Sequence, residues 1–399
     1  MAEPKETPRF NLFSEEFARC PQKVYAEMRA ACPVTRAMIT EQPVLSRYED
    51  VAWALRHPEI FSSAMDLQMA LGTERPMIPQ QVDPPAQTRY RRLLDPHFSR
   101  RKMEVRIPSI RANANALIDT FIDAGECEFD EAFAIPLPCI AFLDLLGLPK
   151  EDLGLFLELK DGIIRPNKAQ PELDLEGAAK ARVASGRRIY EYFERTLEER
   201  RREKASREDL LSSILFAEID GERLSDTEIL DICFLLLLAG LDTVTAALGC
   251  NIAYLASNPV QRRRLVEHPE LVPGAVEELM RWETPVTAVP RLVKRDVEVG
   301  GMWIREGELA TLLIGAANTD DSHFPEADRV DFERERNIHM AFGAGPHRCL
   351  GSHLARMELC AAMEEWHRRI PDYGIKPGET PRYSPGIREV LYLPIVWER

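Results

Sequence analysis

The chain has 399 residues, of which 45% are hydrophobic and 29% are charged, a globular composition that excludes disordered, collagenous and fibrous classes. Lysine and arginine number 51 and aspartate and glutamate number 65, so the net charge of -14 argues against general attraction to nucleic acid or anionic membranes. The length allows one large domain or two to three smaller ones.

The N-terminal sequence MAEPKETPRFNLF has no apolar core behind its charges, so we expect neither a signal peptide nor a membrane anchor. The longest apolar run, Ile232–Leu241, is about half of the ~20 residues that span a bilayer, and it predicts a buried helix segment. The eight cysteines form no CxxC pair and have no histidines at zinc spacing. We therefore expect a cytoplasmic protein with free thiols and no membrane contact.

The first eighty residues mix short extended pieces with helix, and the pattern from Arg100 to Glu218 is helical. Pro58 ends a short helix, and the run GRRIYEYFERTLEERRREKAS alternates acids with bases, which is typical of a solvated amphipathic helix. The predicted elements are a helix Cys20–Cys32, a strand Val44–Tyr48, a helix Asp50–His57, and helices Ile110–Asp123 and Ser185–Ser206.

A capping box, Ser225 followed by Glu228, predicts a helix that runs on to Ser257, 32 residues or roughly 48 Å at 1.5 Å per residue. Asn258 is expected to cap the next helix. The later predicted elements are a helix Pro273–Trp282 and strands Ala288–Val299, Met302–Ile304, Leu309–Ile314 and Val390–Val396. These patterns favour one mainly α domain over residues 1–399, with small strand-rich portions near residues 35–65, 288–316 and 385–397.

The most unusual local sequence is Phe342–Gly351, which reads FGAGPHRCLG. Its glycines and proline prevent a regular helix, while the apolar spacing from Leu350 onward predicts an amphipathic helix directly afterwards. Cys349 is therefore expected at a helix N-terminus, where the helix dipole stabilises the thiolate, the form that binds metal. A plain loop with a buried cysteine also fits, and the absence of GxGxxG excludes a dinucleotide fingerprint. Cys349 could also be a nucleophile, but the sequence places no base for it.

A second signal lies within the long apolar helix, at Ala239–Thr243, which reads AGLDT. An acid and a hydroxyl in an apolar segment cost desolvation energy unless they form hydrogen bonds, and Gly240 weakens the helix by roughly 0.5–1 kcal/mol relative to alanine. One interpretation is structural, with Thr243 bonded to the preceding turn and Asp242 reaching the surface. The other is a proton relay beside a ligand that approaches Gly240.

A third signal is Glu278 and Arg281, an acid and a base three residues apart on one helix face. Taken together, the three signals resemble the cytochrome P450 superfamily of haem-thiolate monooxygenases, most closely the soluble bacterial camphor hydroxylase group. The resemblance covers nearly the whole chain. The matched motifs are FGxGxHxCxG at Phe342, Gly343, Gly345, His347, Cys349 and Gly351, AGxDT at Ala239, Gly240, Asp242 and Thr243, and ExxR at Glu278 and Arg281.

The resemblance implies a P450 fold with haem b buried between the long central helix and the cysteine loop. The iron would be ligated by the thiolate of Cys349, and Asp242 and Thr243 would deliver protons during oxygen activation. The other residues implied at the haem are Gln87, Arg91, Arg291, Phe342, Gly343 and His347, among which the arginines suit the propionates.

The resemblance also implies that Glu278 and Arg281 form a structural ion pair. An arginine from the following segment, Arg329 or Arg334, would complete it.

The implied reaction inserts one atom of O2 into a C–H bond of a hydrophobic small molecule, which would be a terpenoid, a steroid or an aromatic compound. The pocket residues implied are Leu235, Leu238, Ala239, Val286, Thr287 and Val289. The substrate-binding tyrosine and the pocket aspartate of the camphor enzyme align with Arg75 and Val289, so camphor itself is not expected. Arg75 would then meet a substrate carboxylate or be an exposed loop arginine.

No flavin or iron–sulfur motif is present, so the resemblance implies that electrons come from an acidic ferredoxin and its reductase. A monomer is expected. One group of residues, here called the basic cluster, fits either a ferredoxin surface or a solvated helix face. Its members are Arg89, Arg91, Arg92, Arg100, Arg101 and Lys102. Two alternative functions are a haem-thiolate enzyme that uses peroxide, whose relatives typically lack the acid–alcohol pair, and a haem-based sensor or ligand-binding protein without turnover.

Overall fold

The computed structural model describes residues 9–65, 72–169, 173–203, 208–219, 221–384 and 387–398. The chain forms two compact units, each assembled from separated stretches of sequence. Unit 1 comprises residues 1–63, 110–134 and 243–399, and unit 2 comprises residues 64–109 and 135–242. The prediction that residues 1–399 form one haem domain stays a prediction.

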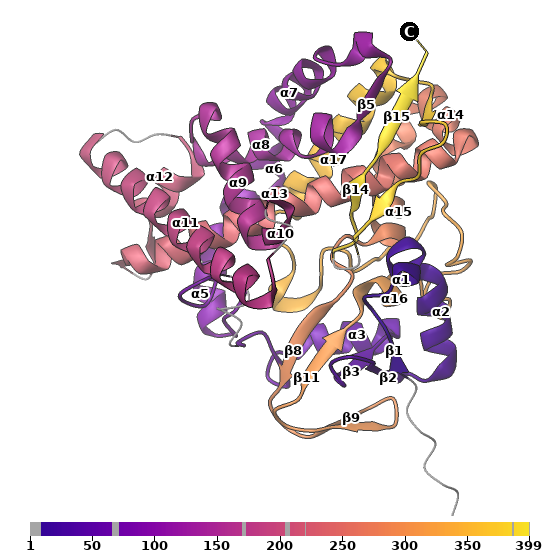
Figure 1. Cartoon of the computed structure of the whole chain (residues 1–399). Coiled ribbons are helices and arrows are strands. Elements are labelled where there is room, and N and C mark those ends of the chain that lie inside the picture. The colour runs from indigo at the N-terminus through magenta and orange to yellow at the C-terminus, as the bar shows by residue number, and fades with distance from the viewer. Residues whose placement is uncertain are drawn as a thin grey trace, which may run out of the picture. The chain divides into compact units, whose positions relative to one another are not determined.

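A six-stranded mixed sheet in unit 1 joins the N-terminal strands to strands from the second half of the chain. The strand order is β1 (Arg9–Phe10), β2 (Val34–Ala37), β3 (Pro43–Leu45), β11 (Leu309–Leu312), β8 (Val289–Val293) and β4 (Phe61–Ser62). The indigo β2 and β3 thus lie beside the orange β11 and β8 (Figure 1). β11 runs parallel to β3, with Thr311 opposite Val44, and antiparallel to β8, with Ala310 opposite Arg291. Arg291 is therefore fixed by the register of a strand that is paired on both sides.

Smaller sheets complete the extended structure. In unit 1 they are the hairpin β9 (Val297–Val299) and β10 (Met302–Ile304), the sheet β12 (Tyr373–Ile375), β15 (Pro394–Trp397) and β5 (Glu126–Glu128), and the pair β13 (Arg382–Tyr383) and β14 (Val390–Tyr392). In unit 2 the pair is β6 (Glu218–Ile219) and β7 (Glu222–Arg223).

Most of the regular secondary structure in both units is helical. Those of unit 1 are α1 (Glu15–Arg19), α2 (Pro21–Ala31), α3 (Tyr48–Arg56), α14 (Pro259–Glu267), α15 (Val272–Glu283), α16 (Ile314–Asn318) and α17 (Ser352–Arg369). Those of unit 2 are α5 (Ala86–Leu94), α6 (Arg100–Glu104), α8 (Pro136–Leu146), α9 (Leu153–Ile164), α10 (Pro166–Ala169), α11 (Leu175–Glu203) and α12 (Leu210–Leu215). α7 (Ile107–Asp119) and α13 (Asp226–Ser257) run through both.

Short turns connect several of these helices. Five are 3-10 turns, and η3 is a π turn. They are η1 (Asp95–Phe98), η2 (Ile122–Ala124), η3 (Asp130–Ala134), η4 (Lys150–Asp152), η5 (Pro269–Leu271) and η6 (Gly345–His347).

The capping box at the start of α13 is confirmed. The Ser225 amide donates to Glu228 Oε2 over 2.8 Å, and the Glu228 amide donates to Ser225 Oγ over 3.3 Å. Among the helices of the described ranges, α13 alone is long and apolar enough to cross a membrane, but 72% of its apolar window is buried inside the molecule. That burial is typical of a core helix.

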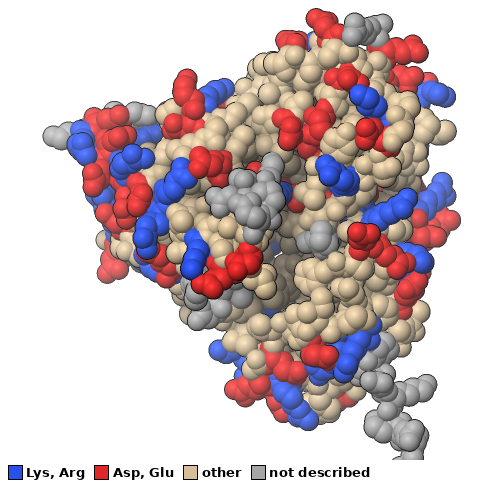
Figure 2. Space-filling view, viewed as in Figure 1, with Lys and Arg blue, Asp and Glu red and all other residues tan. Residues whose placement is uncertain are grey.

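The amphipathic helix predicted at residues 185–206 is the second half of α11, and the last predicted residues, 204–206, lie outside the described ranges. Its buried face includes Ile189 and Phe193 and packs on α9. Lysines and arginines alternate with aspartates and glutamates over the exposed face (Figure 2). Exposed pairs such as Arg188 with Glu158 account for this alternation.

Several predicted boundaries are wrong. The expected strand Ala288–Val299 is two strands, β8 and β9, and the expected strand Leu309–Ile314 gives way to α16 at Ile314. Tyr48 begins α3 instead of ending a strand. Asn258 occupies the N-cap of α14, but its side chain makes no capping bond and donates to the Tyr254 carbonyl instead.

Candidate functional site

The loop that carries Cys349 is shaped by turns at two glycines. Gly343 and Gly345 have φ of 69° and 67°, a left-handed conformation that residues with a Cβ rarely adopt. The loop folds back on itself, because the Cys349 amide donates a hydrogen bond to the Phe342 carbonyl over 2.8 Å. The two turns and this bond fix the backbone that leads to the thiol.

Gly345 also meets a close neighbour. A Cβ on Gly345 would lie 2.4 Å from the Leu55 carbonyl oxygen at the end of α3, so only glycine fits against that backbone. A Cβ on Gly351, at the other end of the loop, would meet no heavy atom within 4 Å. The loop is therefore constrained sterically at Gly345 and is open at Gly351.

Cys349 is one of two exposed cysteines, the other being Cys20. Burial raises the pKa of Cys127 and of Cys360 to about 12, which keeps those groups as thiols. α17 begins at Ser352, later than the Leu350 start that the apolar pattern predicted, so Cys349 precedes the helix by three residues. An exposed thiol on a fixed turn suits a metal ion, provided that the ion enters with the rest of its ligands.

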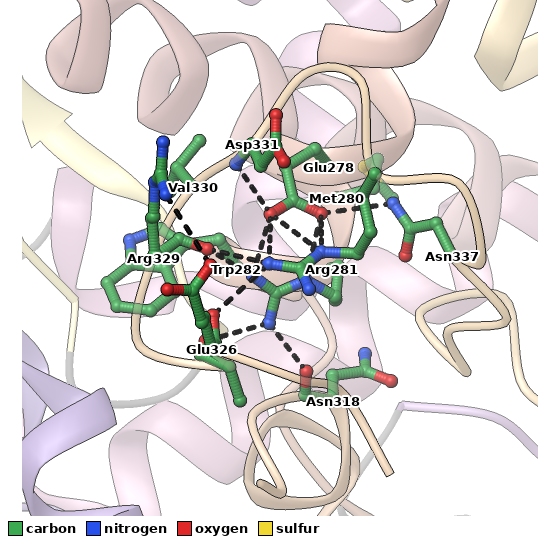
Figure 3. A network of polar contacts seen from close by, with 12 residues as sticks. Glu278, Met280, Arg281, Trp282, Asn318, Glu326, Arg329, Val330, Asp331 and Asn337 are labelled. Carbon is green, nitrogen blue, oxygen red and sulfur yellow. Dashed lines mark hydrogen bonds and ion pairs between the residues drawn. The ribbon is translucent and has the colours of Figure 1, made fainter.

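Glu278 and Arg281 form the centre of a buried polar network (Figure 3). Arg281 Nε and Nη2 donate to the two Glu278 oxygens over 2.9 and 2.8 Å, and both side chains are fully buried. Arg281 Nη1 donates to the carbonyls of Asn318 and Ala327 over 2.9 and 3.0 Å. The pair therefore holds α15 to two later segments of the chain.

Arg334, and not Arg329, supplies the second guanidinium of this network. Its Nε lies 3.1 Å from Glu278 Oε2, and Asn337 Nδ2 donates to the same oxygen over 3.1 Å. Arg329 contributes its backbone carbonyl, which accepts from Arg281 over 3.0 Å, while its side chain is 66% exposed beside Glu326. A side-chain pattern could not have revealed a role that belongs to a carbonyl group.

The polar residues implied at the haem are divided between the two units. Arg291 of β8 and His347 of η6 belong to unit 1, and Gln87 and Arg91 of α5 belong to unit 2. Gln87 and Arg291 are buried. Arg91 Nε pairs with Asp95 over 2.8 Å, which orients its guanidinium along α5.

Asp242 is buried and contacts two cations. Lys160 Nζ donates to its Oδ1 over 3.1 Å, and Arg165 Nη2 lies 3.0 Å from both of its oxygens. The carboxylate of Asp161 lies 3.2 Å from Lys160 and 3.1 Å from Arg165. The structural interpretation in which Asp242 reaches the surface is therefore wrong.

Lys160 is as deeply buried as Asp242, with 1% of each side chain accessible. Burial alone would lower its pKa, but the carboxylates of Asp242 and Asp161 outweigh burial and raise that pKa. Lys160 thus stays protonated at neutral pH and donates its hydrogen bond to Asp242.

The middle of α13 carries an apolar face that is not fully covered. Ala239 is exposed and Leu235 and Leu238 are half-buried, whereas Leu237 and Leu241 on the opposite side are fully buried. Residues 235 and 239 stack one turn apart on a helix. An uncovered apolar stripe on a core helix fits the flat apolar face of a cofactor. An exposed thiol on a rigid turn fits the metal centre of such a cofactor. In the segment after α15, Val286 and Val289 are half-buried and Thr287 is buried.

Arg75 is occupied within unit 2. Its Nε donates to Asp231 over 2.9 Å, and its guanidinium carbon lies 4.8 Å from the Tyr190 ring centroid. Tyr190 also donates to Asp231, over 3.3 Å. Arg75 is therefore a half-buried cation that joins its loop to α11 and α13, and it is not a fully exposed loop arginine.

The basic cluster is partly neutralised. Arg89 pairs with Glu228 over 2.8 Å, and Arg100 pairs with Glu104 over 2.8 Å. Arg101 and Lys102 are exposed on α6. The positive potential of this surface is therefore smaller than its six cations imply.

Comparison with known proteins identifies this assembly of motifs. The family model described as cytochrome P450 matches residues 163–366. The chain belongs to the cytochrome P450 family. It is therefore a monooxygenase with a cysteine-ligated haem iron, and it acts with O2 on a small-molecule substrate.

Relatives with known names support this assignment. The mycinamicin IV hydroxylase/epoxidase of Micromonospora griseorubida is 34% identical over 94% of both chains. A steroid C26-monooxygenase of Mycobacterium tuberculosis is 34% identical over 92% of this chain and 91% of its own. The structure of CYP109E1 from Bacillus megaterium in complex with testosterone matches with a TM-score of 0.87 and 30% identity, over 97% of this chain and all of the other. The P450 fold predicted from the sequence is confirmed.

Sequence reasoning missed the cations around Asp242 and the contacts of Glu277. Lys160 stands in LGLFLELKDGII, and a lysine in an apolar helical pattern is a usable sign of a buried charge that needs a partner. Glu277, which precedes Glu278, gave no separate signal because adjacent acids on a helix are common on surfaces.

Proposed function

We propose that this P450 hydroxylates a steroid or a terpenoid of similar size. The observation that carries the proposal is the uncovered face of α13, where Leu235, Leu238 and Ala239 present only apolar groups. Such a surface binds a hydrophobic substrate by area and shape and gives it few polar anchors. The names of two relatives support the choice, since one is a steroid C26-monooxygenase and another was crystallised with testosterone.

In this proposal Cys349 would supply the thiolate that ligates the haem iron. It is the exposed cysteine that lies on a fixed turn, and the cofactor that it holds activates O2. Phe342 and Gly343 shape the turn. The propionates would be bound by Gln87, Arg91, Arg291 and His347, whose N–H groups suit carboxylates.

Asp242 and Thr243 would move protons toward the oxygen during turnover. Asp242 is held by Lys160 and Arg165, whose Nζ and Nη2 lie 3.1 and 3.0 Å from its Oδ1. We infer that a proton passes from this ion cluster to Asp242 and then to Thr243, the next residue of the same helix. The Thr243 hydroxyl is the group that donates at the end of the path.

The electron donor is proposed to be an acidic ferredoxin in the cytoplasm, and the protein is proposed to act as a monomer. Arg101 and Lys102 are exposed members of the basic cluster, as are Arg92 and Arg100, and this surface would attract an acidic partner. Rates of reduction by ferredoxin should fall as ionic strength rises. A rate independent of salt would remove this surface from the proposal.

A spectral titration tests the substrate class. Steroids and monoterpenes are added to the haem-loaded protein, and we expect steroids to shift the iron from low to high spin at lower concentration because they bury more of the α13 face. A Leu238→Asp variant should weaken this shift by roughly ten-fold or more, since an unpaired charge on the apolar face costs over 1.4 kcal/mol. Equal binding of steroids by the variant would contradict the proposal.

The ligand is tested with a matched pair of cysteine variants. Cys349→Ser should abolish the thiolate spectrum of the ferrous carbon monoxide complex, whereas Cys20→Ser, which alters the other exposed cysteine, should leave it unchanged. A thiolate spectrum that survives in Cys349→Ser would show that another cysteine is the ligand.

A further inference from the structure

Glu277 contacts chain segments on both sides of the Cys349 loop. Its carboxylate accepts two hydrogen bonds from Arg356 of α17, from Nε over 2.6 Å and from Nη2 over 2.8 Å. Its Oε2 also lies 3.1 Å from Nε2 of His339. His339 is ten residues before Cys349 and Arg356 is seven residues after it. One carboxylate on α15 therefore bridges the two flanks of the loop.

His339 is satisfied at both ring nitrogens as a neutral group. The Ala341 amide donates to Nδ1 over 3.2 Å, so Nδ1 accepts and the ring hydrogen lies on Nε2, directed at Glu277. The side chain is 2% exposed. The loop entrance is thus tied to α15 by a buried hydrogen bond, which loses its acceptor if Glu277 moves.

Arg356 connects the carboxylate to the loop itself. Its guanidinium carbon lies 4.2 Å from the centroid of the Phe342 ring, and the His339 ring centroid lies 6.0 Å from the same centroid. A cation over an aromatic face is attracted to it. Phe342 in turn accepts the Cys349 amide hydrogen bond. Contacts therefore run from Glu277 through Arg356 and Phe342 to the backbone of Cys349.

The carboxylate of Glu277 is charged at neutral pH. Partial burial alone would raise its pKa, but the hydrogen bonds from His339 and Arg356 lower that pKa to about 2.

Two neighbouring acids of α15 hold successive parts of the chain. Glu278 binds Arg334 and Asn337, and Glu277 binds His339 and Arg356.

We propose that Glu277 and Arg356 are positioning residues that hold the Cys349 thiolate in the orientation needed to ligate the haem iron. They act through Phe342 and His339, which fix the backbone of the loop. The inference rests on the proposed role of Cys349 as the ligand. In this inference Glu277 and Arg356 affect the bond between the Cys349 thiolate and the iron, apart from what they contribute to folding.

The test uses the haem-loaded full chain with two conservative variants. Glu277→Gln keeps the shape and removes the charge, and Arg356→Lys keeps the charge and removes the planar bidentate contact. In both we expect a larger fraction of the ferrous carbon monoxide complex in the thiol-ligated form, a shifted haem reduction potential and roughly ten-fold faster haem dissociation, as for other residues that support a metal ligand. The double variant should be less affected than the sum of the two, because the residues act as a pair.

Matched controls separate positioning from general destabilisation. Glu270→Gln changes an exposed acid just before α15, and Arg368→Lys changes an arginine of α17 that is 60% exposed. Neither should alter the spectrum or the potential. Urea unfolding identifies any variant that has merely lost stability.

The test of the positioning role can fail independently of the test of Cys349 as the ligand. If Glu277→Gln and Arg356→Lys keep the native fraction of thiolate form and the native potential while Cys349→Ser loses the thiolate spectrum, the positioning role is wrong and the ligand stands. If Cys349→Ser keeps the thiolate spectrum, the ligand assignment fails and this inference fails with it.

Discussion

Arg165 Nη2 lies 3.0 Å from both carboxylate oxygens of Asp242. With Lys160 on the same carboxylate, a buried acid has two cations within hydrogen-bond distance. An isolated charge in such a place would be very costly, so the three residues depend on one another. Asp242 is therefore held by its surroundings and is not simply an acid exposed to a cavity.

Neutralising Asp242 should destabilise the protein because it leaves Lys160 buried with a weaker partner. We expect Asp242→Asn to lower the free energy of unfolding by about 3 kcal/mol, and Lys160→Met to restore part of that loss in the double variant. Urea unfolding of the two single variants and the double variant measures the coupling. Strictly additive effects would contradict mutual dependence.

Asp242→Asn and Thr243→Ala should also reduce the amount of product formed per reductant consumed.

The glycines of the cysteine loop should differ in their tolerance to alanine. Gly345→Ala should lose most bound haem, because its Cβ would lie 2.4 Å from the Leu55 carbonyl and its φ is +67°. Gly343→Ala, with a similar φ and no Cβ contact below 3.7 Å, should be affected less. Gly351→Ala should bind haem normally. Haem content per chain after purification measures the order, and equal loss in Gly345→Ala and Gly351→Ala would contradict the steric argument.

Two arginines near the ExxR motif should also differ. Arg334→Ala removes a guanidinium from a fully buried carboxylate and should cost about 2–4 kcal/mol of unfolding free energy. Arg329→Ala should change it by less than about 0.5 kcal/mol, because the side chain is 66% exposed and its carbonyl remains. Chemical unfolding compares them directly. A larger loss in Arg329→Ala would show that the side chain matters after all.

Stability should fall in acid partly through Glu365 of α17. Burial alone would raise its pKa, but hydrogen bonds from Asn115, Arg368 and Arg111 lower it to about 2 from its ordinary 4.5. The unfolded chain therefore binds a proton first as pH falls, so this stabilisation is complete above about pH 4.5 and is lost as pH falls toward 2.

Glu365→Gln should accordingly flatten the dependence of unfolding free energy on pH in this window. The matched change Glu298→Gln, at an exposed position of β9, should leave the slope as it is. An unchanged slope in Glu365→Gln would count against this account.

Much of the fold could be predicted because the signals were local. The capping box at Ser225 and the apolar run after it define α13, and Met302–Ile304 is a strand as predicted. The break between β8 and β9 could not be predicted, because β8 pairs with the distant β4 while β9 pairs with the neighbouring β10. The start of α16 at Ile314 follows the end of β11, which pairs with the equally distant β3.

The candidate site could likewise be predicted only in part. Motif spacing indicated Cys349, Asp242 and Glu278, but not the residues that support them. Lys160 is 82 residues from Asp242 and Arg356 is 79 residues from Glu277, so only tertiary structure shows these contacts.

The sheet that joins the two ends of the sequence also determines when the protein can assemble. β3 needs β11 as its neighbour, and the Tyr48 amide donates to Asp320, 272 residues further along the chain. During synthesis α3 therefore lacks these partners until about four-fifths of the chain has been made. Since Gly345 lies against the end of α3, the cysteine loop can form only after this late closure, and capture of haem should be among the last events in the maturation of the protein.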